Sequence, residues 1–248
     1  MKNTDLKKKY DDMHTEGTTA WFDDGTLERQ LIFKMGEPWH GKNVLEIGCG
    51  EGDLLAMIED NGARVTGIDY SARAVSNGEV KHPGLKLLCA DYKDFAGKFD
   101  VIVMQGVLEH QDSPLVALKW MIDAYQPSVV ITSSPAFINP RGIVWMVLDM
   151  LGAVMSKTDI HYLNPWQFEA FCFGNGYRYQ AWSTDTDWAK GKKMVEDLAQ
   201  RIPLALVDGH IKYKKSRLDK LLKWLEQAGP DLAIGPLGGA VVVYRIDI

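Results

Sequence analysis

The sequence predicts an α/β fold: one domain built on a doubly wound, mostly parallel sheet of seven strands, the last of them antiparallel. Short apolar runs alternate with segments of helical periodicity from about residue 43 to residue 183, a pattern typical of βα units. Most of these runs are apolar at consecutive positions, as expected of a sheet covered on both faces. A last apolar run, 240–246, comes about fifty residues after the sixth, which favours an antiparallel strand at or near an edge.

Each element follows from an apolar run or from helical spacing. The strands expected, in order, are 43–47, 64–68, 85–89, 100–104, 128–133, 177–183 and 240–246. The helical segments expected are 53–61, 71–79, 113–125, 143–155, 165 to about 175, 189–201 and 212–228. Asn164 can cap the helix that starts at Pro165, and Gly174 or Gly176 can end it.

Four regions are expected within the single domain. They are an amino-terminal lead or flap (1–40), a cofactor-binding core (41–135), a substrate-side segment (136–176) and a helical insertion before the last strand (184–238). The first residues carry charge but no apolar central run, unlike a secretory signal. The longest apolar stretch, 143–155, is too short to span a bilayer.

Composition narrows the class of protein. A net charge of -5 argues against a general nucleic-acid coat, so we expect no DNA partner. Three cysteines, at positions 49, 89 and 172, match neither metal-ligand spacing nor a disulfide set. A reducing compartment suits them, and we expect a cytoplasmic protein.

The stretch VLEIGCGEGDL runs from a strand through Gly48, Gly50 and Gly52 into a helix. Glycines let a backbone turn sharply and approach a ligand, and a helix amino terminus offers N–H groups to it. A dinucleotide fingerprint would need its third glycine where Asp53 stands, which disfavours a nicotinamide oxidoreductase. The loop is G-x-G-x-G instead, preceded two positions earlier by Glu46.

Two acidic residues follow the next strands. Asp69 closes the second strand, 21 residues after Gly48, where it can accept two hydrogen bonds from a ribose diol. Asp91 comes just after the third strand and can reach an adenine amino group, while Tyr92 can flank the ring. The Asp69 feature alone does not separate nucleoside cofactors.

Together, E-x-G-x-G-x-G, Asp69, Asp91 and the strand-ending VLEH resemble the class I S-adenosylmethionine-dependent methyltransferases over residues 40–135. The resemblance implies a Rossmann-like methyltransferase sheet with the cofactor across its carboxyl edge, and S-adenosylhomocysteine as product. Gly48 and Gly50 would approach the methionine portion. The cofactor-binding residues that we expect are Glu46, Gly48, Cys49, Gly50, Gly52, Asp69, Tyr70, Asp91, Tyr92 and Gln105.

The segment QGVLEH, after the fourth strand, is similar to the quinone-biosynthesis O-methyltransferases, whose pattern here is often E-x-x-E-H. In those relatives the three side chains can hold magnesium. In this chain the first position is Gly106, and two ligands instead of three put metal dependence in doubt.

Three roles are open to Glu109 and His110. His110 can act as general base, or the pair can orient substrate or cofactor. Alternatively, both cap the backbone ahead of the helix that Ser113 and Pro114 begin. His161, just before a helix, is a second candidate base or a helix cap.

Acceptor recognition is expected outside the cofactor core. The lead carries Tyr10, His14 and Trp21, which suit a flap over the substrate or an ordinary docking segment, and Glu109 is a further substrate candidate. The apolar segment 143–155 would suit an aromatic or lipid-like acceptor, or form a buried helix.

Residues 212–224 carry five lysines and one arginine opposite leucines at helical spacing. A solvated surface helix is the ordinary interpretation, and membrane contact or an acidic substrate is the alternative. The function expected is S-adenosylmethionine-dependent methylation of a small molecule, with O-methylation slightly favoured over N-methylation. RNA or protein methylation and a catalytically silent cofactor-binding subunit are the alternatives; the oligomeric state is not indicated.

Overall fold

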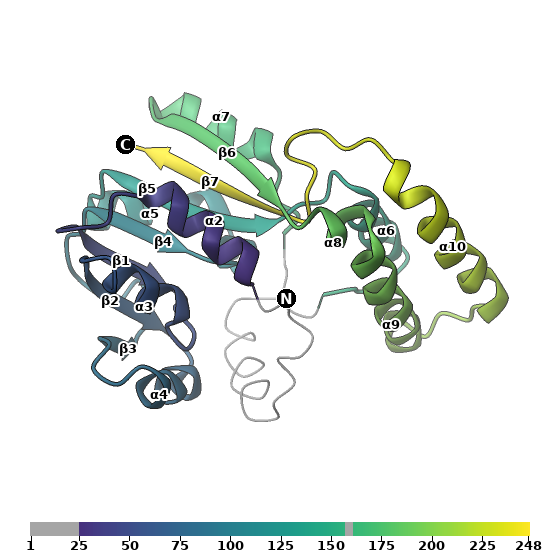
Figure 1. Ribbon diagram of the computed structural model, residues 1–248, viewed down its shortest axis with the longest axis horizontal. Coiled ribbons are helices and arrows are strands. Elements are labelled where there is room, and N and C mark those ends of the chain that lie inside the picture. The colour runs from purple at the N-terminus through teal and green to yellow at the C-terminus, as the bar shows by residue number, and fades with distance from the viewer. Residues whose placement is uncertain (1–24, 157–160) are drawn as a thin grey trace. The chain divides into compact units, whose positions relative to one another are not determined.

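The structure is a computed structural model that describes residues 25–156 and 161–248 (Figure 1). The chain divides into two compact units. The described residues of the first unit are 25–134, 166–181 and 243–248, and those of the second are 135–156, 161–165 and 182–242. The expectation of a single domain stays a prediction. Tyr10, His14 and Trp21 lie outside the described residues.

The sheet has seven strands, in the spatial order β3-β2-β1-β4-β5-β7-β6. They are β1 (Asn43–Ile47), β2 (Arg64–Asp69), β3 (Leu87–Cys89), β4 (Val101–Met104), β5 (Val129–Pro135), β6 (Arg178–Thr184) and β7 (Val241–Asp247). The first five are parallel, and the arrow of β7 points opposite to that of β6 (Figure 1). The predicted fold class is confirmed, with the antiparallel strand next to the edge.

The central strands are buried along their length, which is why they contain consecutive apolar residues. Every residue of β4 is buried, and so are four of the five residues of β1. The helices of this part of the chain are α2 (Thr26–Gly36), α3 (Asp53–Glu59), α4 (Ala72–Lys81), α5 (Pro114–Tyr125) and α7 (Pro165–Asn175). Of these, α2 was not predicted, because the lead 1–40 was treated as one flap.

A compact apolar core fixes α2 and α3 against the sheet. Ile32 and Trp39 are buried beside Leu55 of α3 and Val44 of β1. Each buried aliphatic or aromatic side chain contributes about 1.5–3 kcal/mol of transfer free energy. The start of α3, and with it the glycine loop, is therefore held by a packed core.

The second unit is helical. It contains α6 (Pro140–Met150), α8 (Thr186–Lys190), α9 (Lys192–Asp208) and α10 (Lys215–Ala228). Its core gathers side chains from α6, α9 and α10, including Trp145, Leu198 and Leu225. The residues of the segment expected at 143–155 therefore differ in their surroundings. Trp145 packs into this core, while Met150 is exposed. The short helix α8 was not predicted.

An ionic cluster joins α6 to α9. The Asp197 carboxylate accepts hydrogen bonds from Nε of Arg141 at 3.1 Å and from Nε of Arg201 at 2.5 Å. The Arg141 guanidinium lies 4.3 Å from the centre of the Trp145 ring. All of these side chains are largely buried. Among the described helices, none is long and apolar enough to cross a bilayer.

Candidate functional site

The predicted cofactor residues meet at the carboxyl ends of the parallel strands. β1 pairs with β2 on one side and with β4 on the other, so the segments that follow these strands share one edge of the sheet. The glycine loop follows β1, Asp69 ends β2 and Gln105 follows β4. Open α/β sheets bind ligands at this edge, where neighbouring loops diverge.

The glycine loop is fixed by backbone hydrogen bonds and leaves one position open. The N–H groups of Gly48 and Cys49 donate to the carbonyl of Ile68 at 2.8 and 3.1 Å. Gly50 has φ +53°, and a Cβ placed there would meet no atom of the described residues 25–156 and 161–248 within 4 Å. The glycine thus gives a left-handed backbone that faces open space, which is what close approach of a ligand requires.

Asp69 is oriented by the loop that it faces. One carboxylate oxygen accepts from the N–H of Gly50 at 2.9 Å, and the other accepts from the N–H of Ser71 at 2.8 Å. Each carboxylate oxygen can accept a second hydrogen bond, so two backbone bonds do not exhaust its capacity. These bonds place Asp69 beside the glycine loop, and its predicted role in binding a ribose diol stays a prediction.

Glu46 lies beneath the loop as a buried acid. Its side chain is 2% exposed, and this burial raises the pKa of Glu46 to about 8, although the Arg29 guanidinium lowers it. Burial likewise raises the pKa of the neighbouring Cys49 thiol well above its usual range. Cys49 is therefore a buried thiol that supports the loop.

Two residues of α2 belong to this region and were missed from the sequence. The Gln105 amide donates to the Glu28 carboxylate at 3.0 Å, and Nη1 of Arg29 lies 3.7 Å from the Asp53 carboxylate. The signal available in the sequence was the adjacent pair Glu28 and Arg29, which stand four and three residues before the buried Ile32. It was too weak to predict a helix that contacts the end of β4.

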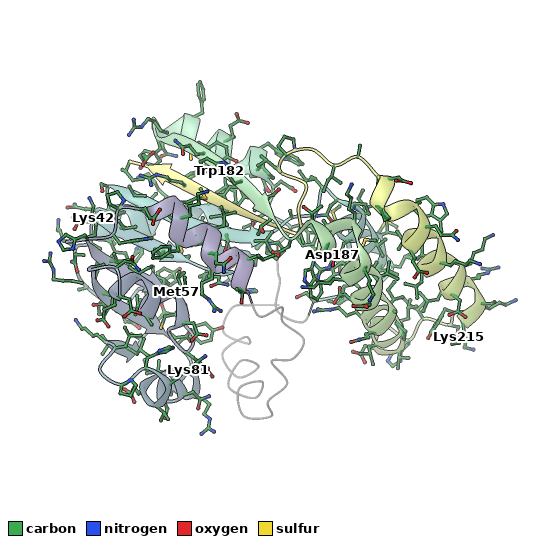
Figure 2. All side chains as sticks on the ribbon, viewed as in Figure 1. Lys42, Met57, Lys81, Trp182, Asp187 and Lys215 are labelled. Carbon is green, nitrogen blue, oxygen red and sulfur yellow. The ribbon has the colours of Figure 1, made fainter. Side chains whose placement is uncertain are left out.

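Asp53, at the start of α3, is held by Lys81, the last residue of α4, and by His82, which follows that helix. Nζ of Lys81 lies 2.8 Å from the Asp53 carboxylate, and Nε2 of His82 lies at the same distance (Lys81 is labelled in Figure 2). Burial alone would raise the pKa of Asp53, but hydrogen bonds from Lys81 and His82 outweigh it and hold the pKa below its usual value. This cluster anchors α4 beside the glycine loop.

The adenine candidates lie in the turn after β3. Asp91 is exposed, and its carboxylate accepts from the N–H of Lys93 at 2.8 Å. Tyr92 is buried, with its ring 5.5 Å from the Trp120 ring in an edge contact. Burial raises the pKa of Tyr92. Tyr70 is half-buried, and its carbonyl lies 3.7 Å from the Cys89 thiol.

The VLEH segment forms a single 3-10 turn, η2 (Leu108–His110), in which Glu109 is buried and His110 half-buried. Gly106 has φ +63°, and a Cβ there would lie 3.4 Å from Oε1 of Glu109. Glycine therefore suits a left-handed position that a glutamate would strain. Among the residues that the structure describes, no group of three acidic, histidine or cysteine side chains could hold a metal ion.

The remaining candidates are placed as follows. Ser113 is the N-cap residue of α5 and Pro114 its first residue, as predicted, although the Ser113 hydroxyl makes no capping bond. His161 is half-buried and belongs to the second unit, in the segment before α7. The Asn164 amide donates to the carbonyl of Tyr162 at 3.3 Å.

The sheet is doubly wound, its glycine loop is open at Gly50, and the Asp69 carboxylate is fixed beside that loop. This combination is typical of the class of enzymes that bind a nucleoside cofactor. A family model described as a methyltransferase domain matches residues 26–232. The chain belongs to this methyltransferase domain family. The resemblance to class I S-adenosylmethionine-dependent methyltransferases is confirmed at the level of family and fold.

Individual relatives agree with this assignment. The ubiquinone biosynthesis O-methyltransferase of Actinobacillus pleuropneumoniae serotype 7 is 33% identical over 118 residues, which are 42% of this chain and 44% of the relative. The chain thus spans less than half the length of that relative. The magnesium protoporphyrin IX methyltransferase of Synechocystis, solved with S-adenosylhomocysteine, has a TM-score of 0.57 at 19% identity, covering 73% of this chain and 93% of the other.

A cyclopropane-fatty-acyl-phospholipid synthase-like protein from Lactobacillus casei also has a TM-score of 0.57, at 20% identity, and covers 89% of this chain and 90% of the other. At these identities, the solved structures show a shared fold.

Proposed function

We propose that this protein transfers a methyl group from S-adenosylmethionine to a small molecule, with an oxygen acceptor slightly favoured over nitrogen. The observation that carries the proposal is the pairing of Asp69 with the open glycine loop at Gly50. The methyltransferase family and the O-methyltransferase named among the relatives support it. Free cysteines at 49, 89 and 172 support a cytoplasmic location.

The residues present fit the cofactor. Open space over Gly50 would admit the methionine portion, and the Asp69 carboxylate, held by two backbone N–H groups, would accept from the ribose diol. We assign the cofactor carboxylate to Arg29, a cation beside the loop. Asp91 and Tyr92 remain the proposed adenine contacts.

The bound cofactor supplies an activated sulfonium methyl group for in-line displacement. The chain's own task is then alignment, which can lower a barrier by about 7–11 kcal/mol. A hydroxyl acceptor must also lose its proton, and we assign that proton to the imidazole of His110, which lies just after the end of β4. His161 remains the second candidate for this role, and Glu109 the proposed orienting group.

Calorimetric titration with S-adenosylhomocysteine, in parallel with NAD, tests the cofactor assignment. We expect micromolar binding of the first and none of the second. Asp69→Ala should weaken binding by about 2–4 kcal/mol, because it leaves ribose donors unpaired in a desolvated crevice. Asp69→Asn should lie between, and Asp60→Ala, an exposed aspartate at the far end of α3, is the control. Unchanged affinity in Asp69→Ala would refute the ribose assignment.

The role of His110 is tested by turnover. His110→Ala should leave the affinity for S-adenosylhomocysteine intact and lower the methylation rate by about 10²–10⁴-fold if the imidazole is the base. His40→Ala, an exposed histidine before β1, is the matched control. A variant that keeps its rate but melts earlier would assign His110 to the turn instead. Turnover by the purified protein would also eliminate the silent-subunit alternative.

A further inference from the structure

We infer that the second unit carries a docking surface for an anionic lipid membrane. Two features that follow one another in the chain form it: an apolar patch on α6, the segment after it and the end of α9, and a basic segment that runs from the loop after α9 into α10. Neither is used by the proposed methyl transfer, so the inference does not depend on it. All the residues involved belong to the second unit.

The patch begins with one face of α6. Its exposed apolar side chains recur at helical spacing, three or four residues apart, and their exposed fractions lie between 37% and 76%. On α6 they are Ile143, Met146, Val147 and Met150, and the segment that follows the helix adds the exposed Leu151 and Val154. The opposite face of the helix is already occupied, since Trp145 and Leu148 pack into the core of this unit. The exposed stripe is therefore a second apolar face, not the edge of the core.

The end of α9 extends the patch. Leu204 and Val207 are 49% and 65% exposed. The two helices end close to each other, because a Cβ on Gly209, the C-cap residue of α9, would lie 2.5 Å from the carbonyl oxygen of Gly152, two residues after the end of α6. Eight exposed apolar side chains thus lie on α6, on the segment that follows it and on the end of α9. Exposed apolar side chains gathered on neighbouring segments, rather than scattered singly, mark an interaction site.

A basic segment adjoins the patch in the chain. Lys212 comes five residues after Val207, and the exposed cations from there to the middle of α10 are Lys212, Lys214, Lys215, Arg217, Lys220 and Lys223. Asp219 is the one acid in residues 212–224, so six positive charges and one negative give +5 in a chain of net charge -5. Asp219 pairs with Lys215 at 3.0 Å (Lys215 is labelled in Figure 2).

Exposed aromatic residues complete the surface. Tyr213 is 41% exposed and Trp224 is 54% exposed, both within the basic segment. Tyrosine and tryptophan favour the membrane interface, where an apolar ring and a polar end are both satisfied.

The positive charge of residues 212–224 favours an anionic lipid surface over a second copy of this chain. A second copy of the chain would bring a like-charged basic segment toward the same region, which costs association energy. An anionic lipid surface instead attracts the lysines and takes up the apolar side chains, which is how helices lie in a membrane interface.

Vesicle partitioning tests the inference. The full-length protein should bind vesicles of phosphatidylcholine with 30 mol % phosphatidylglycerol, and bind pure phosphatidylcholine vesicles far more weakly. The double variant Met150→Glu, Val154→Glu should reduce the partition coefficient at least ten-fold, because it places charge in the apolar patch. The triple variant Lys212→Gln, Lys214→Gln, Lys220→Gln should reduce it about five-fold per lysine and flatten its salt dependence.

The control is Val80→Glu, Val116→Glu, which adds the same charge at exposed valines of α4 and α5 in the first unit. It should bind vesicles like the wild type, and circular dichroism should show all variants folded. Vesicle binding unchanged in the patch variant would overturn the inference. So would a dimer, by light scattering, that the patch variant converts to monomer, or RNA binding that the lysine variant abolishes while vesicle binding persists.

Discussion

At the residue scale, burial of Glu46 makes the protonation of its carboxyl differ between the folded and the unfolded protein. Glu46 precedes the first glycine of the loop, Gly48, by two residues. Burial raises the pKa of its carboxyl to about 8, against an ordinary value of 4.5. Arg29 is the principal group that opposes this effect. In the folded protein, Glu46 is thus largely protonated at pH 7, whereas it is ionised in the unfolded chain.

The pH dependence of stability follows from that difference. Between about pH 4.5 and pH 8 the folded protein binds one proton more than the unfolded chain, so Glu46 makes the free energy of unfolding fall as pH rises through this window. Glu46→Gln should remove this contribution. Urea unfolding at pH 5 and at pH 8 measures it, with Glu79→Gln, an exposed glutamate of α4, as control. An identical pH slope in Glu46→Gln and the wild type would contradict the assignment.

Sequence spacing was sufficient for some site residues and not for others. The glycines and Asp69 stand at fixed offsets from strands whose apolar character is local, so their meeting at one sheet edge could be predicted. Glu28 and Arg29 contact residues more than twenty positions away, through a helix placed by tertiary packing. No local pattern encodes such contacts.

At the element scale, the Arg141–Asp197–Arg201 cluster holds α6 to α9. Removing the central carboxylate leaves two largely buried guanidinium groups without their shared acceptor. Breaking a buried ion pair in this way costs about 3–5 kcal/mol, because the remaining charge stays desolvated.

Asp197→Ala should therefore lower the free energy of unfolding by about that amount, measured by denaturant titration. Asp219→Ala is the matched control, since it breaks the exposed pair with Lys215 and should cost about 0–1 kcal/mol. Equal losses in the two variants would show that the cluster does not stabilise the fold.

The elements differ in how well their sequence predicts them. The strands of the sheet agree with expectation to within about two residues. In β1 and β4 the reason is burial on both faces, which requires consecutive apolar side chains. In α2, only three residues are buried, and the helix was missed because the whole of 1–40 was interpreted as a lead. The interpretation of 143–155 as either wall or core helix was incomplete, since α6 has both a packed and an exposed face.

At the scale of the whole molecule, ligand binding should protect the two units differently. S-adenosylhomocysteine at 100 times its Kd should raise the free energy of unfolding by about 2.7 kcal/mol. Because Glu46, Gly50 and Asp69 all lie in the first unit, hydrogen exchange should slow most at 46–52 and 68–71. The same experiment with NAD is the control. Absence of protection in those two segments would place the cofactor elsewhere.

The position of β7 has a consequence for synthesis on the ribosome. This strand lies between β5 and β6, although more than a hundred residues separate it from β5 in the chain. Until β7 has emerged, β6 has no neighbour on the sheet, and β5 presents an unpaired edge to other chains. The nascent chain therefore completes its parallel core early but leaves its sheet open until the last strand is made. During that interval the unpaired edge of β5 is open to strands of other chains, which raises the chance of mispairing.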